Sequence, residues 1–529
     1  MERIEGFKTG AGKLLALLRK VMFGEVWMAA ETLAAALFFL FGQEVAGVVF
    51  FVYVISFKLI VSDDSLCGFL PFLLIGLMVL RLYDSFARFM ALKFVMGVPA
   101  VFGVLFHFIF YRKKPHLGGL SKGYLSVAVA LALGGLFSLP LTHYFSGTSI
   151  YYTYGLGFGL LLLYSLLVRG LNPHNAYDIK EFVAKTAFYC AAFAVFIIAV
   201  QYLGNLRDIS EGGWEFSEKH LSSLANNLST TVLLTMPFLF YLSRKGGARG
   251  AAAFALGVLE GLASVLSLSR GGMIFSSAMC AYLVVHTLRT DKAGRKRDLV
   301  ILGAIAAAAI LIVALCRKQL AVLYGEGIVN SGKTVKVIFF GAALFAFAVT
   351  AYVRYLFRIK DKKKRLAHLA ILSSLFVVGL AVFIVKFDSL QPLLIKADYY
   401  RGNMMIVAAK NFKIYPIFGT GIGYRGLRSI YQNKEGMFGC YHCLPVQIVG
   451  SLGLVGVAAY LFMFRERLSV LSKGKNAAFS DAVLFSYLGL LWISLVNPGI
   501  FCPVVYGLQL AVYFIAAERG DENTEISEK

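Results

Sequence analysis

Apolar runs of about 17 to 22 residues recur along the whole chain, and each is long enough to cross the hydrocarbon core of a bilayer as a helix. Of the 529 residues, 59% are hydrophobic and only 15% are charged, whereas a soluble domain is about a quarter charged. The sequence therefore predicts an all-α, polytopic integral membrane protein with about 14 to 16 transmembrane helices. The expected spans are 26–42, 45–61, 66–81, 90–110, 122–143, 148–168, 182–204, 223–243, 249–268, 271–288, 298–316, 335–356, 367–386, 443–464, 479–496 and 500–517.

No internal repeat of fixed period divides the chain, so we expect one membrane domain. The first 24 residues are polar and basic with a short apolar patch, which predicts a leader at the inner surface rather than a cleaved signal peptide. The expected stretches are a basic cytoplasmic leader (1–24), N-terminal transmembrane helices (25–204), a core (205–465) with one long outward-facing loop (387–442), C-terminal transmembrane helices (466–517) and a cytoplasmic tail (518–529).

Lys and Arg outnumber Asp and Glu by 52 to 29. In a soluble protein this excess would suggest nucleic acid, but cytoplasmic loops of membrane proteins collect Lys and Arg, so we expect no nucleic-acid partner. The predicted spans place the basic loops on one side, together with both termini. We therefore expect a multi-pass protein of the cytoplasmic (inner) membrane with both termini in the cytoplasm. The loops concerned are 111–116, 243–249, 290–297, 358–365 and 465–475.

The loop 387–442 is expected on the outer side and is nevertheless basic. Long outer loops cross the membrane regardless of their charge, which is the ordinary explanation. The functional explanation is an anionic substrate that arrives at the outer face, such as a lipid-linked diphosphate. The charged residues are Lys396, Arg401, Lys410, Lys413, Arg425, Arg428 and Lys434 against Asp388, Asp398 and Glu435.

Within this loop, residues 401–412 have helical periodicity, and Pro416 with Gly419, Gly421 and Gly423 ends the helix. Glycine permits backbone conformations closed to other residues and lets a ligand approach closely. Such a turn could present N–H groups to a phosphate, or it could be a simple loop that re-enters the membrane. A dinucleotide site is not expected, because the turn does not follow a strand.

Arg270 lies between two apolar spans, among small residues in the sequence Ser-Leu-Ser-Arg-Gly-Gly. Its planar guanidinium suits two phosphate oxygens at once, although a snorkelling interfacial Arg would give the same pattern. His442 stands where the long loop meets the next span, and a histidine titrates close enough to neutral pH to act as a general base. The predicted topology places Arg270, Arg401 and His442 at one outer interface.

Two acids, Glu31 and Glu260, lie inside apolar spans. A carboxyl group there needs a partner or a cavity. We expect Glu260 to be structural or to line a cavity rather than to act in catalysis.

Together these elements resemble the superfamily of O-antigen ligases and O-antigen polymerases, the WaaL/Wzy-like membrane glycosyltransferases. The resemblance covers roughly residues 200–465. The sequence differs from the family pattern at Cys443, where Asn is usual, and at Ser451, where an acid is often found. The predicted spans also exceed the family's usual dozen or so. Three motifs carry the resemblance: Ser269-Arg270-Gly271; Arg401 followed by YPIFGTGIG at 415–423; and His442 followed by Val446-Gln447 and LGLVG at 452–456.

The resemblance implies a GT-C-like architecture and a glycosyl transfer at the outer face that uses no metal and no other cofactor. A glycan would move from undecaprenyl diphosphate to a sugar hydroxyl of a glycan or glycolipid acceptor at the lipid bilayer. Arg270 and Arg401 would neutralise the leaving diphosphate, and His442 would take the proton of the acceptor hydroxyl. Further substrate-binding candidates are Lys413, Arg425, Arg428, Gly419, Gly421 and Gly423.

Other functions stay open at this point. A ligase and a polymerase would share the donor and differ in the acceptor, and the sequence does not separate them. A transporter or flippase of lipid-linked sugars would show charged residues along a path through the membrane and internal repeats; the chain has two mid-span acids and no repeat. A non-catalytic scaffold of a polysaccharide assembly complex would give Arg270, Arg401 and His442 no reason to converge.

Overall fold

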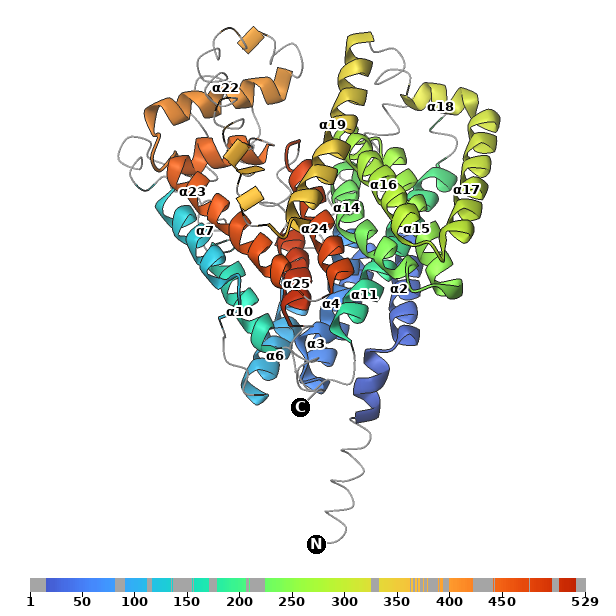
Figure 1. Cartoon of the computed structure of the whole chain (residues 1–529). Coiled ribbons are helices and arrows are strands. Elements are labelled where there is room, and N and C mark those ends of the chain that lie inside the picture. The colour runs from blue at the N-terminus through green and yellow to red at the C-terminus, as the bar shows by residue number, and fades with distance from the viewer. Residues whose placement is uncertain are drawn as a thin grey trace.

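The computed structural model describes residues 16–80, 91–111, 117–134, 157–170, 178–205, 224–324, 333–361, 399–421, 443–474, 476–496 and 504–519, with short pieces and single residues between them. All regular elements in these ranges are helical, which confirms the prediction of an all-α fold (Figure 1). Within them, eight helices are long and apolar enough to cross a membrane, or nine if the bent pair 16–22 and 25–40 forms one span. Several other predicted spans correspond to shorter apolar helices.

Most of the predicted spans coincide with helices of the structure, and the expected span 367–386 lies largely outside the described residues. The helices are α2 (Glu25–Leu40), α3 (Glu44–Val61), the 3-10 turn η1 (Ser65–Gly68), α4 (Phe69–Val79), α6 (Lys93–Phe110), α7 (Ser121–Leu133), α10 (Leu160–Gly170), α11 (Ile179–Gly204), α14 (Leu224–Ser243), α15 (Gly247–Leu266), α16 (Arg270–Thr290), α17 (Arg295–Leu315), α18 (Arg317–Tyr324), α19 (Lys333–Arg358), α22 (Tyr399–Ile414), α23 (Leu444–Lys473), α24 (Ala477–Ile493) and α25 (Val504–Arg519).

Helix α14 is the central element of the described bundle and packs against α11, α15, α16 and α24. Its Phe238 is fully buried and contacts Phe479 of α24 and Tyr513 of α25, with ring centroids 5.5 and 4.3 Å apart. The helix is also rich in Ser and Thr, whose hydroxyls return hydrogen bonds to its own carbonyls; Thr230 Oγ1 donates to Asn226 O at 2.8 Å. Because these polar groups are satisfied locally, α14 can lie in an apolar interior.

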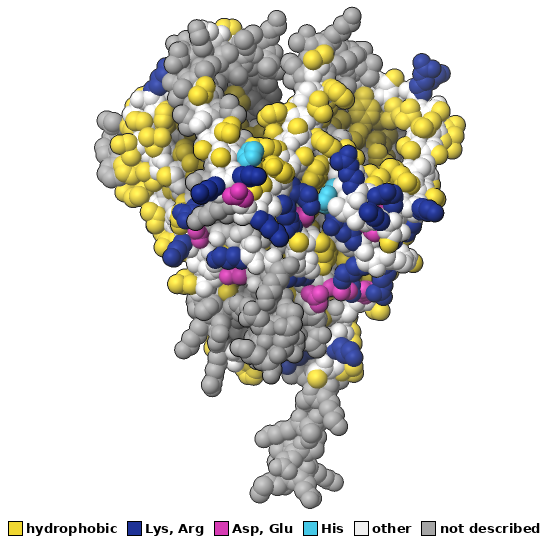
Figure 2. All heavy atoms as spheres, viewed as in Figure 1, with side chains coloured by type: hydrophobic (Ala, Val, Ile, Leu, Met, Phe, Trp, Pro, Cys, Tyr) yellow, Lys and Arg dark blue, Asp and Glu magenta, His cyan; other side chains and the backbone are white. Residues whose placement is uncertain are grey.

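Helices α14, α15, α16 and α17 run in alternate directions, so the basic turns after α14 and α16 lie at the same end of the bundle. The turns after α14, α16 and α23 and the C-terminal end of α19 lie away from α18 and α22, which occupy the upper end in Figure 1. Figure 2 shows the Lys and Arg side chains as a band below the apolar upper part. The break between α15 and α16 lies at the other end of both helices, so the basic turns and the predicted site occupy opposite ends of the bundle.

The two acids inside apolar helices both have partners. Glu31 of α2 pairs with Lys58 of α3, with Oε1 2.6 Å from Nζ, and Trp27 Nε1 donates to the same oxygen at 2.7 Å. Glu260 of α15 is fully buried and accepts a hydrogen bond from Thr235 of α14. Glu260 therefore joins two packed helices, in agreement with the structural role predicted for it.

Candidate functional site at the upper helix ends

The predicted site residues that the structure describes lie at or beside the ends of α16 and α22. Arg270 is the first residue of α16, and its side chain is exposed. Arg401 lies in the first turn of α22, and the structure describes its backbone only. His442 precedes the start of α23 and lies outside the described residues, as do Gly423, Arg425 and Arg428. Lys413 is exposed near the end of α22.

A short break between α15 and α16 places Arg270 at a helix N-terminus. Ser269 caps α16, because its Oγ accepts a hydrogen bond from Gly272 N at 3.1 Å. Leu268 has a φ of 60°, which makes it the one non-glycine with positive φ in the described part of the chain. A side chain rarely adopts this conformation, and such strain clusters at functional sites. A positive side chain on a helix N-terminus is a favourable place for an anion.

Small side chains under this break allow α14 and α16 to approach closely. Ser269 Oγ donates to Asn226 Oδ1 of α14 at 2.6 Å, and Ser229 Oγ lies 3.1 Å from Ser267 Oγ. A Cβ atom added to Gly272 would lie 2.0 Å from Ser229 Oγ. The Ser and Gly residues around Arg270 are therefore needed for helix packing, whether or not they also leave room for a ligand.

The turn after α22 docks on a break inside α23. Gly453 has φ 60° and ψ −154°, which interrupts the helical hydrogen bonds of α23. The amides of Leu454 and Val455 then donate to the carbonyls of Pro416 and Ile417 at 2.9 and 3.1 Å. The break in one helix thus supplies the donors that hold the turn of the other.

Gly419 and Gly421 have positive φ angles of 65° and 88°. The amide of Gly421 donates to Ser451 O at 2.8 Å and that of Gly419 to Tyr415 O at 3.0 Å. A Cβ atom on Gly419 would lie 2.3 Å from the carbonyl carbon of Ser451. The protein fold thus accounts for both glycines: both amides bind protein carbonyls, Gly419 permits the close approach to Ser451, and Gly421 adopts a positive φ that other residues rarely adopt. Their part in binding a substrate stays a prediction.

The residue before His442 is held by α22 and α23. Tyr441 is buried, and its amide donates to Gln447 Oε1 at 2.8 Å. Its hydroxyl accepts a hydrogen bond from Asn411 Nδ2 of α22 at 2.7 Å. The backbone that leads into position 442 is thus attached to the helix that carries Arg401.

The starts of α16 and α23 meet at the C-terminal end of α24. The amide of Leu444, the first residue of α23, donates to Ser494 O at 2.7 Å. A Cβ atom on Gly271, the second residue of α16, would lie 2.3 Å from Val496 Cγ2, so α16 touches the residues that follow α24. The starts of α16 and α23 therefore lie close together. In the sequence, these starts adjoin Arg270 and position 442. Helix α22 packs on α23.

Three amide side chains, Asn226, Asn411 and Gln447, hold these helix ends together. The sequence predicts that Asn226 caps a helix or binds sugar hydroxyls, and Gln447 enters only as part of the motif after His442. Asn411 and Gln447 are each 1% exposed. A buried amide beside a candidate motif is a usable signal, because such a group needs a partner. Its partner, however, comes from a distant part of the chain and is not visible in the local pattern.

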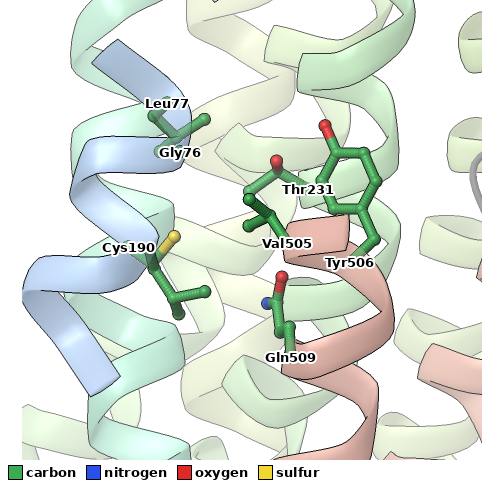
Figure 3. Close-up of a pocket in the computed structure, with 8 residues that line it drawn as sticks. Gly76, Leu77, Cys190, Thr231, Val505, Tyr506 and Gln509 are labelled. Carbon is green, nitrogen blue, oxygen red and sulfur yellow. The ribbon is translucent and has the colours of Figure 1, made fainter. Parts of the chain in front are cut away.

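A small cavity elsewhere in the bundle is not a substrate site. It measures about 20 Å³ and lies between α4, α11, α14 and α25 (Figure 3). This volume holds about one water molecule. Its lining includes Thr231, Tyr506 and Gln509, and Tyr506 donates to Asn227 O at 2.8 Å.

Comparison with models of known protein families finds no match, and comparison with characterised proteins finds no significant relative. The resemblance to O-antigen ligases and polymerases therefore rests on the motifs alone.

The contact between the turn after α22 and the break in α23 leaves no room for a methyl group at position 453. We expect Gly453→Ala to destabilise the protein by about 1 to 3 kcal/mol, because the new Cβ would lie 2.6 Å from the carbonyl oxygens of Pro416 and Ile417 at positive φ. Thermal unfolding in detergent measures this. The control is Gly303→Ala in α17, where nothing lies within 4 Å of the added Cβ. Equal melting temperatures for both variants would show that the break in α23 is not needed.

Proposed function

We propose that the chain is a membrane glycosyltransferase similar to O-antigen ligases, which moves a glycan from undecaprenyl diphosphate to a sugar hydroxyl. The observation that supports this most is the convergence of the starts of α16 and α23 on one end of α24. A protein that only crosses the bilayer has no need to bring the start of α16 with Arg270, the start of α23 and a crosswise basic helix to the same end.

The proposed site lies at the outer face of the cytoplasmic membrane. The basic turns occupy the opposite end of the bundle, and the positive-inside tendency assigns that end to the cytoplasm. Helix α22 lies across the upper end in Figure 1. A lipid-linked donor would then present its diphosphate at the level of Arg270 and α22.

The transfer is an exchange at the anomeric carbon of the donor sugar. The acceptor oxygen attacks this carbon, its proton passes to His442, and the bond to the diphosphate oxygen breaks. Arg270 and Arg401 neutralise the charge that the diphosphate acquires as it leaves. The N-terminus of α16 adds its partial positive charge beneath Arg270.

The proposal is tested with purified protein in proteoliposomes and a glycan on undecaprenyl diphosphate. Transfer that requires an added glycolipid acceptor indicates a ligase, and lengthening of the lipid-linked glycan with donor alone indicates a polymerase. Movement of the donor across the bilayer without transfer to either acceptor would contradict the proposal and indicate a flippase.

A substitution of Arg270 tests whether this residue takes part in the transfer. We expect Arg270→Gln to lower the transfer rate by about 10²- to 10³-fold, because the leaving diphosphate loses a guanidinium and its two donors. The matched control is Arg317→Gln, since Arg317 is also an exposed first residue of a helix at this end. Loss of activity in both variants alike would point to surface charge rather than to a site at Arg270.

A further inference from the structure

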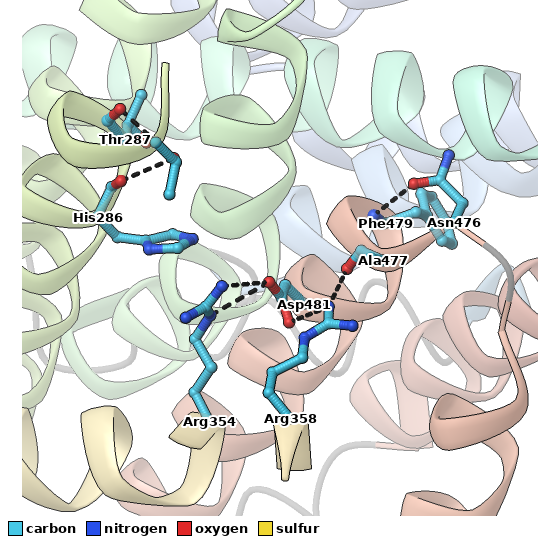
Figure 4. A network of polar contacts seen from close by, with 9 residues as sticks. His286, Thr287, Arg354, Arg358, Asn476, Ala477, Phe479 and Asp481 are labelled. Atoms are coloured by element: carbon cyan, nitrogen blue, oxygen red, sulfur yellow. Dashed lines mark hydrogen bonds and ion pairs between the residues drawn. The ribbon is translucent and has the colours of Figure 1, made fainter. Parts of the chain in front are cut away.

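A second group of arginines lies at the opposite end of the bundle, where α19 ends and α24 begins. Asp481 of α24 accepts hydrogen bonds from Arg354 Nη2 and Nε at 3.1 and 3.2 Å and from Arg358 Nη2 at 2.6 Å (Figure 4). The Asp481 side chain is 5% exposed, whereas Arg354 and Arg358 are 28% and 35% exposed. One buried carboxylate is thus shared between two guanidinium groups that solvent or a ligand can reach.

Arg244, in the turn between α14 and α15, adds a third positive charge. Its Nε atom is buried and has no hydrogen-bond partner. Burial lowers the pKa of Arg244; Asp481 raises this pKa, and the positive charges of Arg354 and Arg358 lower it. These groups are therefore close enough to interact, and the three arginines repel one another.

The acids nearby do not balance this charge. Asp481 is already shared, and Asp291, the other acid acting on Arg244, accepts a hydrogen bond from Gly294 N at 3.0 Å. Arg354 and Arg358 are four residues apart on one helix, a spacing at which like charges destabilise each other. The group formed by Arg244, Arg354, Arg358 and Asp481 has a net positive charge and an unused donor.

His286 of α16 supplies a further polar atom without a partner. The side chain is 7% exposed, and its Nε2 atom has no hydrogen-bond partner. The ring stacks on Tyr282, with centroids 5.9 Å apart and planes 6° from parallel. Figure 4 shows the imidazole directed toward Arg354 and Asp481. A neutral imidazole can donate from Nε2 to an anion.

The neighbouring surface of α19 is apolar and exposed. In its segment Phe339–Arg358, only 17% of an apolar 18-residue window is buried, and Phe340, Leu344 and Tyr355 are 75%, 59% and 56% exposed. An apolar helix face that ends in two arginines suits a molecule with acyl chains and an anionic head group. Basic sites between helices on the cytoplasmic side bind such head groups.

We propose that Arg244, Arg354, Arg358 and His286 bind the phosphate of an anionic phospholipid whose acyl chains lie along α19. A guanidinium can donate to two phosphate oxygens at once. Three guanidinium groups and one imidazole donor therefore suit a single phosphate. The site is separate from the proposed transfer site and does not depend on it, because the two lie at opposite ends of the bundle.

The test measures binding of phosphatidylglycerol to the delipidated full-length protein in detergent by native mass spectrometry. We expect Arg244→Gln to weaken binding about fivefold or more. The matched control is Lys296→Gln, which removes the same charge from an exposed position in the neighbouring turn region and should bind as the unmodified protein does. Unchanged binding by Arg244→Gln would overturn the proposal.

Two further measurements test whether the ligand is a lipid or free phosphate, and whether the result depends on one variant that fails to fold. Phosphatidylcholine and inorganic phosphate should compete poorly with bound phosphatidylglycerol. If inorganic phosphate displaces the bound lipid as effectively as added phosphatidylglycerol does, the ligand is not a lipid. Arg354→Lys keeps the charge beside Asp481 and removes the guanidinium fork, so it should also bind more weakly. Full affinity in this variant would overturn the phosphate geometry even if Arg244→Gln does not fold.

Discussion

Replacing His442 by alanine is expected to lower the rate of glycan transfer by about 10²- to 10⁴-fold while the protein still folds. The variant loses the group that would take the proton of the acceptor hydroxyl. The hydrogen bonds beside position 442 use the amides of Tyr441 and Leu444, so they do not depend on the imidazole. The measurement is the initial rate with saturating lipid-linked donor, compared with the melting temperature of the same preparation.

The control for this prediction is another histidine at a distance from the site. His368 contacts Tyr352 of α19, with Nδ1 2.8 Å from the hydroxyl oxygen, and His368→Ala should retain the rate. Arg401→Ala should be inactive as well, since it removes a guanidinium from the diphosphate. Full activity in His442→Ala would show that His442 is not the base. Full activity in Arg401→Ala would show that Arg401 does not neutralise the diphosphate.

The largest effect on stability is expected at the buried ion pair. Lys58→Met should lower the free energy of unfolding by about 3 to 5 kcal/mol, because Glu31 would be left in the interior without its counter-charge. The Lys58 and Glu31 side chains are only 2% and 5% exposed, so water cannot replace the lost partner. Thermal unfolding in detergent, followed by tryptophan fluorescence or light scattering, measures the loss.

Two variants show whether this cost comes from the unpaired charge. The double variant Glu31→Leu with Lys58→Met removes both charges and should recover most of the stability, since apolar residues can replace a buried pair. Lys245→Met breaks the pair with Glu181, in which the lysine is 42% exposed, and should cost less than about 1 kcal/mol. A double variant as unstable as Lys58→Met would show that packing, not charge, is lost.

The helices themselves could be predicted from the sequence, because the length and apolarity of a run are properties of consecutive residues. The helical segment after Tyr399, its end before Pro416 and the start of a helix beside Arg270 were predicted for the same local reasons. The grouping of the basic turns at one end also followed, since alternate spans must return to the same side. The length of the spans was less predictable: η1–α4 and α24 are shorter than a full span.

The contacts between distant segments could be decided only by the tertiary structure. Nothing near Glu31 in the sequence indicates Lys58, and nothing near Gly419 indicates that Ser451 will lie against it. A hydrogen bond or an ion pair needs two groups at a set distance, and that distance depends on how the helices pack. The sequence by itself determined which segments are helices and which polar residues stand at their ends. The packing around α24 determined that the starts of α16 and α23 meet, because Ser494 contacts the start of α23 and Val496 contacts the start of α16.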